Sequence, residues 1–350
     1  MSEKKNINNK LIDYAAAKAI IAKRKTTLSS DKLAQKILAG DRAALSQGIT
    51  RIESQAAQHQ QTAQEILSKC ILKAGKSIRI GITGVPGVGK STFIENFGNL
   101  LTENGHKVAV LAIDPSSSKT RGSILGDKTR MATLTQNPDA FIRPSAAGES
   151  LGGVARKTRE SIILCEAAGY DVILIETVGV GQSETAVHQM TDFFLLLKLP
   201  GAGDELQGIK RGIIELADLI VINKADGKNI KAAQTARDAF AKALHLYPKR
   251  ENGWQPKAQT CSAQNKTGLK EVLDVLETYF STIKNSGFFE QNRKHQNQYW
   301  LKKVIDDRLH TAFYSDSIIK KTYPKIMEQV INGKLTPFQA AEDLLKRYNS

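Results

Sequence analysis

The feature that most constrains this chain is a glycine-rich octapeptide at residues 84–91, Gly-Val-Pro-Gly-Val-Gly-Lys-Ser. It fits the phosphate-loop pattern G-x-x-x-x-G-K-[ST]. Residues 78–82 before it are mostly apolar, as in a short buried strand, and residues 91–101 after it carry apolar side chains at helical spacing. A chance match at a glycine-rich turn would not explain both flanks. The segment therefore predicts a strand, a loop whose backbone N–H groups wrap a polyphosphate, and a helix whose N-terminus favours the anion.

The last residues of this pattern have distinct expected roles. Lys90 can reach the β and γ phosphates of a nucleotide, and the Ser91 hydroxyl can ligate Mg²⁺. The phosphate-contacting set that we predict is Gly84, Val85, Pro86, Gly87, Val88, Gly89, Lys90, Ser91 and Thr92.

From residue 77 onward, apolar runs alternate with helical patterns, which favours an α/β fold with a mostly parallel sheet covered by helices. The expected class is a P-loop NTPase with helical N- and C-terminal extensions. The predicted strands are residues 78–82, 108–113, 171–175, 193–197 and 219–222.

Acidic residues follow two of these strands at the edge where the phosphate loop lies. Asp114 comes directly after residues 108–113, and Glu176 follows four apolar residues in the arrangement called Walker B. Both are expected on the metal side of the site, although Asp114 could instead cap a turn before Pro115. Asp127, in a loop rich in glycine and charge, is a possible second metal-directed carboxylate.

Other candidates lie in loops. Gly179 can present its backbone N–H to the γ-phosphate, and Arg130 can offset phosphate charge. Gln182 is a candidate for positioning the attacking water, but it lies three residues beyond Gly179, whereas in Ras-like proteins the glutamine follows that glycine directly. The long segment 199–212, with Gln207 and Lys210, is expected to move.

A base-recognition motif, N-K-x-D, follows the predicted strand 219–222 as Asn223, Lys224 and Asp226. The Asp226 carboxylate can accept two hydrogen bonds from guanine, and adenine lacks that pair of donors, so the motif selects GTP over ATP. Asn223 can tie loops together and the Lys224 stem can stack along the base. Further along, Ser262 and Ala263 belong to a small-residue loop of the kind whose backbone N–H groups bind guanine O6.

The flanks are basic and are expected to be helical. Helices are predicted over residues 15–22, 31–38, 291–310 and about 317–331, with Asp41 and Thr336 as expected N-caps of further helices. Leu45, Ile49 and Ile52 are expected to form an apolar stripe on the N-terminal flank. Net charge is +15, and residues 1–76 hold 14 Lys and Arg against 6 Asp and Glu. This charge could serve an acidic partner or a nucleic acid, but solvated helix faces explain it more simply. The three cysteines are isolated, there is neither a signal-peptide pattern nor a membrane-spanning run, and we expect a cytoplasmic protein without nucleic-acid or membrane partners.

With these motifs, the chain resembles the MeaB/ArgK family of GTPases, to which methylmalonic aciduria type A proteins belong. The resemblance is dense over residues 77–284. Beyond the phosphate loop, it rests on segments 114–117, 123–131, 176–184 and 199–212.

The resemblance implies a homodimeric GTPase that gates adenosylcobalamin loading and protects methylmalonyl-CoA mutase. Because no internal arginine finger can be assigned in the sequence, we expect slow intrinsic hydrolysis that the partner stimulates. GTP or GDP and Mg²⁺ would be its own cofactors, and adenosylcobalamin would be involved only through the mutase. Ser91, Asp114, Asp127 and Glu176 would form the metal side, and the loop ending at Lys210 would couple to the mutase. The implied domains are a helical extension (1–76), a GTPase domain (77–284) and a helical dimerisation region (285–350).

Two segments depart from the family pattern: Arg121 replaces a small residue, and residues 146–149 replace a serine-rich stretch. Both segments lie in loops that are expected to face a partner protein, so these departures affect the prediction of coupling to the partner more than the prediction of nucleotide binding. Alternatives are a GTPase chaperone for another metallocentre or cofactor enzyme, or an RNA- or targeting-associated GTPase. A nickel-inserting relative would carry Cys and His clusters, and the six histidines here are scattered. The C-terminal helices could also simply pack on the core.

Overall fold

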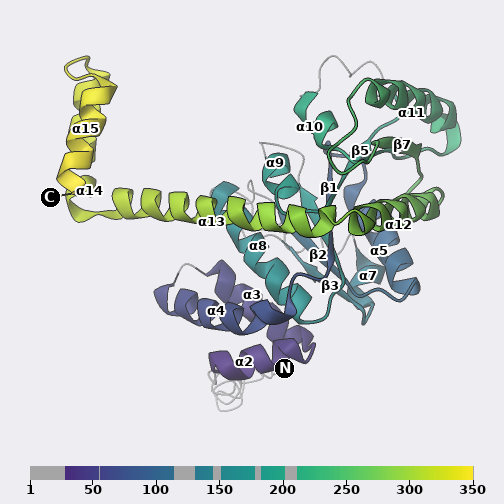
Figure 1. Cartoon of the computed structure of the whole chain (residues 1–350), viewed down its shortest axis with the longest axis horizontal. Helices are drawn as coiled ribbons and strands as arrows, with labels where there is room; N and C mark the ends of the chain where they lie inside the picture. The colour runs from purple at the N-terminus through teal and green to yellow at the C-terminus, as the bar shows by residue number, and fades with distance from the viewer. Residues whose placement is uncertain are drawn as a thin grey trace, which may run out of the picture. The chain divides into compact units, whose positions relative to one another are not determined.

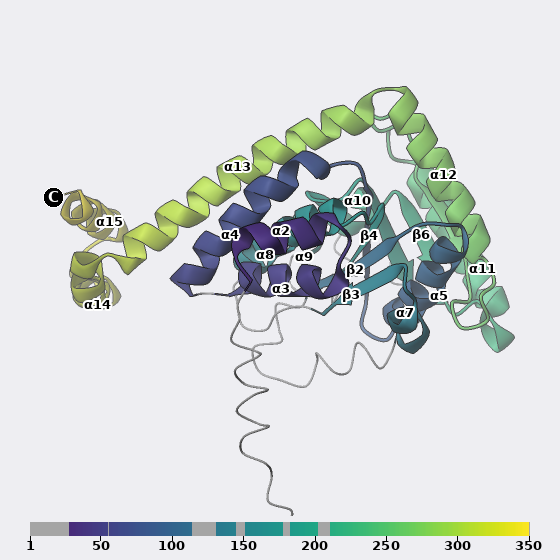
Figure 2. The same ribbon diagram turned by 90° about the horizontal axis from the view of Figure 1, so that it is seen from below.

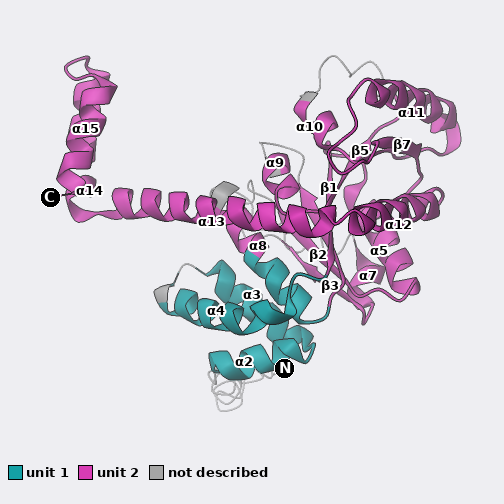
Figure 3. Ribbon diagram, in the orientation of Figure 1, with its two compact units in different colours: residues 1–76, 160–169 teal, residues 77–159, 170–350 magenta. Residues whose placement is uncertain are grey.

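The computed structural model describes residues 28–54, 56–113, 131–144, 151–177, 183–201 and 211–349. The chain forms two compact units, residues 1–76 with 160–169 and residues 77–159 with 170–350 (Figure 3). Each unit is described by itself below. The three-domain division that we predicted from the sequence stays a prediction.

The first unit is helical. It contains α2 (Ser30–Leu38), α3 (Arg42–Glu53), α4 (Ala57–Cys70) and the short 3-10 helix η1 (Ile71–Lys73). The predicted cap is confirmed, because the Asp41 carboxylate accepts from the Ala43 and Ala44 backbone N–H groups, both at 2.9 Å. The predicted apolar stripe of Leu45, Ile49 and Ile52 is buried. The helix expected over residues 15–22 lies outside the described residues.

The second unit is built on a parallel sheet (Figure 1). This sheet has seven strands in the order β3-β2-β4-β1-β5-β6-β7. Its strands are β1 (Ile78–Gly84), β2 (Val108–Ile113), β3 (Ala140–Arg143), β4 (Val172–Thr177), β5 (Phe193–Lys198), β6 (Leu219–Ile222) and β7 (Lys257–Thr260). All five predicted strands are confirmed. The two that the sequence did not indicate, β3 and β7, are four-residue strands at the two edges.

Helices cover both faces of this sheet. They are α5 (Lys90–Glu103), α7 (Ala132–Gln136), α9 (Ser183–His188), α10 (Arg211–Leu216), η4 (Gly227–Asn229), α11 (Ile230–His245) and α12 (Leu269–Asn285). The helix α8 (Leu151–Ala167) belongs to the second unit up to residue 159 and to the first unit from residue 160. Successive β1 side chains alternate between faces. Ile80 and Ile82 join the core cluster with α5 and α12, whereas Gly81 faces Val187 of α9. A Cβ at Gly81 would lie 3.0 Å from Val187, so glycine lets α9 approach the centre of the sheet.

Three helices end the chain: α13 (Phe288–Ser315), α14 (Ser317–Ile331) and α15 (Pro337–Tyr348). The long helix predicted over residues 291–310 is confirmed and extends further at both ends. Within the second unit, α13 runs out from α12, and α14 and α15 pack together at its far end around Ile319 and Leu344 (Figures 1 and 2). The predicted cap at Thr336 is a capping box with Gln339. In the described part of the chain, no helix has the length and apolar character needed to cross a membrane.

Candidate nucleotide site

The phosphate loop joins the central strand to a helix, as predicted. β1 ends at Gly84 and α5 begins at Lys90. Gly89 has φ +96°, and a Cβ there would lie 2.8 Å from Asn223 Nδ2. A Cβ at Gly84 would lie 2.6 Å from the Leu197 carbonyl oxygen. Glycine is therefore required at both positions. At Gly89 the reason is the left-handed backbone, and at Gly84 it is the close approach of the Leu197 backbone.

Lys90 folds back over this loop. Its Nζ donates to the Gly84 carbonyl at 2.8 Å and to the Val85 carbonyl at 3.4 Å. Burial lowers the pKa of Lys90, and the carboxylates of Glu176 and Glu184 oppose that shift. The Lys90 ammonium thus lies near two carboxylates and is bonded to two carbonyls of the phosphate loop. Phosphate oxygens of a bound nucleotide are expected at this loop.

Glu176 owes its position to strand register. It lies in β4 opposite Ile82 of β1, and the next pair of side chains is joined by a hydrogen bond from Thr177 Oγ1 to Thr83 Oγ1 at 2.7 Å. The Glu176 side chain is almost fully buried. Glu184, the second residue of α9, is 4% exposed and was not among the predicted site residues. Its proximity to Lys90 could not be read from the sequence, because a separate helix brings it there.

The base-recognition motif is bonded directly to the phosphate loop. Asn223 follows β6; its Nδ2 donates to the Val88 carbonyl at 2.8 Å, and its Oδ1 accepts from Ala263 N at 3.0 Å and from the Cys261 thiol at 3.3 Å. The tie expected of Asn223 is therefore present as three hydrogen bonds, and it links three loops that are far apart in sequence.

The Asp226 carboxylate accepts a hydrogen bond from the Ser262 hydroxyl, which itself accepts from Asn265 N at 3.2 Å. Asn96 of α5, which we did not predict, donates from Nδ2 to the Ala263 carbonyl at 2.9 Å. The helix that begins at the phosphate loop thereby also holds the loop of residues 261–263. Lys224 is exposed and has φ +59°, a conformation that is uncommon for a residue with a side chain.

The structure thus brings together the predicted residues 84–92, Glu176, Asn223, Lys224, Asp226, Ser262 and Ala263 around the carboxyl ends of β1, β4 and β6. Seven other predicted residues lie outside the described ranges, and their roles stay predictions: Asp114, Asp127, Arg130, Gly179, Gln182, Gln207 and Lys210.

A parallel sheet with a phosphate loop after its central strand, an acid on the neighbouring strand and an N-K-x-D motif two strands away defines a P-loop GTPase. Comparison with known proteins refines this class. Residues 45–317 match the family model described as methylmalonyl-CoA mutase-associated GTPase MeaB, and the chain belongs to that family.

Its relatives span most of the chain. It is 49% identical over 321 residues to a putative GTPase of Caulobacter vibrioides, covering 92% of this chain and 98% of that protein. It is 45% identical to the GTPase ArgK of Escherichia coli, covering 85% and 90%. It is 44% identical to the mitochondrial methylmalonic aciduria type A homolog of Mus musculus, covering 91% and 80%.

A solved structure of an LAO/AO transport system kinase superposes with a TM-score of 0.73 at 36% identity, covering 92% of this chain and 98% of that one. The family, the GTPase class and the P-loop fold expected from the sequence are therefore confirmed.

Proposed function

We propose that this GTPase gates adenosylcobalamin loading of methylmalonyl-CoA mutase and protects the mutase from inactivation. The family description supports association with the mutase. The observation that carries the GTPase part is Asn223, whose hydrogen bonds hold the phosphate loop and the guanine-side loop in one arrangement. Movement at either loop on nucleotide exchange would be felt at the other, which a gating protein requires.

The nucleotide roles follow from the geometry and the motifs. Lys90 would exchange its contacts with the Gly84 and Val85 carbonyls for phosphate oxygens, and Asp226 would read guanine with Ser262 fixing its carboxylate. Ser91, at the first turn of α5, and Glu176 offer hydroxyl and carboxylate oxygens, the hard donors that Mg²⁺ prefers. The bound ion would offset phosphate charge during hydrolysis.

Six residues that lie outside the described ranges complete this proposal. Asp114 and Asp127 would add carboxylates on the metal side, Arg130 would offset phosphate charge, and Gln182 would position water. Gln207 and Lys210 would belong to the segment that couples to the mutase. The cellular setting that we propose is the cytoplasm, with GTP, GDP and Mg²⁺ as ligands and adenosylcobalamin met only on the mutase.

The C-terminal helices are the proposed dimerisation region. Large apolar side chains on α13, α14 and α15 are exposed: Leu301, Ile305, Leu309, Ile331 and Phe338. Leu309 is 61% exposed and Phe338 is 85% exposed, and a second copy of the chain would cover them. In light scattering after size exclusion, Leu309→Glu with Phe338→Glu should convert a dimer into a monomer. A monomeric wild-type protein would refute this part of the proposal.

The central experiment measures steady-state GTP hydrolysis by the purified protein, alone and with the methylmalonyl-CoA mutase of the same organism. We expect stimulation of at least about tenfold, since a partner-ordered catalytic group typically contributes about 10³–10⁵ in rate. Lys90→Ala should abolish both rates. The Asp226→Asn variant should no longer hydrolyse GTP. It should instead hydrolyse xanthosine triphosphate, and the mutase should stimulate that rate by the same factor. No complex and no stimulation would leave a GTPase whose client is another protein.

A further inference from the structure

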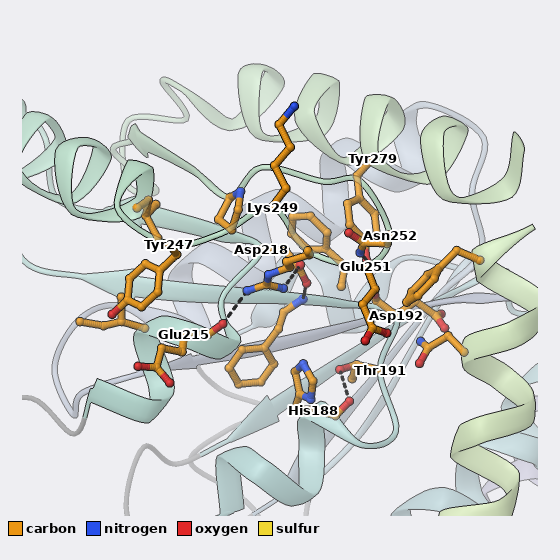
Figure 4. A pocket seen from close by; sticks show the side chains of 18 of the residues that line it. His188, Thr191, Asp192, Glu215, Asp218, Tyr247, Lys249, Glu251, Asn252 and Tyr279 are labelled. Carbon is orange, nitrogen blue, oxygen red and sulfur yellow. Dashed lines mark hydrogen bonds and ion pairs between the residues drawn. The ribbon is translucent and has the colours of Figure 1, made fainter. Parts of the chain in front are cut away.

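A cavity in the described part of the second unit (Figure 4) is lined by none of the nucleotide-site residues named above. Its volume is about 670 Å³, within the range of small-molecule sites. Asp192, directly before β5, and Asp218, directly before β6, line it. It therefore opens at the amino ends of these strands, whereas the phosphate loop and Asn223 lie at the carboxyl ends. The roles argued so far leave it without a function.

Two buried acceptors in this cavity have no hydrogen-bond partner among the described residues: Asp192 Oδ1 and Gln296 Oε1. The Asp192 side chain is fully buried; its other oxygen accepts from Arg79 N at 2.8 Å and from Arg293 at 2.6 Å. Gln296 is 2% exposed, and its Nε2 donates to the Thr191 carbonyl at 2.7 Å, which fixes the amide oxygen on the other side. A bound molecule that donates hydrogen bonds would satisfy both atoms.

Among the side chains that line the cavity, carboxylates outnumber cations, although Arg293, which is not part of the lining, already pairs with Asp192. Arg250 is already used, because its guanidinium pairs with Asp218 and donates to the Glu215 and Ala217 carbonyls, both at 2.7 Å. The carboxylates of Glu215 and Glu251 also line the cavity, and the Lys249 ammonium points away from Asp218 in Figure 4.

His188 does not supply positive charge at neutral pH, because burial, aided by Arg250, lowers its pKa to about 4. Burial raises the pKa of Asp192 although Arg293 and Arg79 oppose the shift, so a cation nearby would stabilise the ionised carboxylate.

Aromatic side chains also line the cavity. They are contributed by Phe193, Phe194, Tyr247, Tyr279 and Phe288. Aromatic faces attract ammonium groups and also pack against the carbon chain of a ligand. We propose that this cavity is a binding site for a small organic cation, an alkylammonium whose N–H groups bond to Asp192 and Gln296 while its carbon chain lies among the aromatic rings.

The test is isothermal titration calorimetry of the full chain with butylammonium and 1,4-diaminobutane, and with 1,4-butanediol as the neutral analogue. At least one amine should bind one site per chain with a Kd below about 1 mM, and the diol should bind at least about tenfold more weakly. If neither amine gives saturable heat, or if the diol binds as tightly, the proposal is wrong.

Two variants locate the site. Gln296→Leu removes one acceptor, and its matched control Gln298→Leu lies on the same helix with its side chain exposed. Asn292→Met fills the cavity and leaves Gln296 unchanged. Both cavity variants should weaken amine binding at least about tenfold, whereas the control should not. GDP binding, measured in parallel, should stay unchanged and shows that each variant is folded. Amine affinity that Asn292→Met does not alter would place the amine elsewhere and overturn the proposal.

Discussion

Replacing Asn223 by Ala tests whether one side chain holds the nucleotide site together. The substitution removes the hydrogen bonds to the Val88 carbonyl, from Ala263 N and from the Cys261 thiol. Asn223 is 2% exposed, and Val88 and Ala263 are also buried, so water cannot easily replace the lost partners. Each buried backbone group left unpaired costs about 1–2 kcal/mol. With the thiol contact worth less, the expected loss of folding free energy is about 2–4 kcal/mol.

Urea denaturation followed by circular dichroism measures this loss. Fluorescence titration with a labelled GDP measures the consequence for the site. If the phosphate loop and residues 261–263 lose their common anchor, about 2 kcal/mol of the loss should reappear as weaker binding, which is about thirtyfold in Kd.

The matched control is Asn265→Ala, in the same loop but with an exposed side chain, whose stability should stay within about 0.5 kcal/mol of wild type. A loss below about 1 kcal/mol for Asn223→Ala, together with unchanged GDP affinity, would refute the reasoning.

Two further predictions follow from single residues. Gly89→Ala should lower the free energy of unfolding by about 1–2 kcal/mol and abolish GDP binding in the same fluorescence titration. The reason is that φ is +96° at Gly89 and the new Cβ would lie 2.8 Å from Asn223 Nδ2. Retained GDP affinity would contradict this prediction, because it would show that the loop can shift. His188→Gln should change how stability depends on pH. The folded pKa of about 4 lies below the ordinary 6.5, so the stability that His188 contributes is present above pH 6.5 and is lost as pH falls towards 4. The difference between the two proteins in free energy of unfolding, measured by urea denaturation, should therefore change by up to about 3 kcal/mol from pH 4 to pH 7. The raised pKa of Asp218, about 6, acts in the opposite direction but is common to both proteins.

Much of the fold could be predicted because its signals are local. The apolar runs that became β1, β2, β4, β5 and β6 are buried on both faces, so each is recognisable without its neighbours. The edge strand β7, with the sequence Lys-Ala-Gln-Thr, carries no such run and is a strand only because β6 pairs with it. The other edge strand, β3, has the sequence Ala-Phe-Ile-Arg, a run of three apolar residues that is too short to indicate a strand, and among the described residues it pairs with β2.

By itself the sequence determined the phosphate loop, the acid of β4 and the N-K-x-D motif, because each depends on residue types at fixed short spacing. Only the tertiary structure decided that Asn223 bonds Val88, that Asn96 holds Ala263 and that Glu184 lies near Lys90. These contacts join segments far apart in the chain, and the first two end on backbone carbonyls, which every residue carries and no side-chain pattern reveals. The cavity of Asp192 and Gln296 was likewise invisible, since five separate segments of the chain must fold before its walls exist.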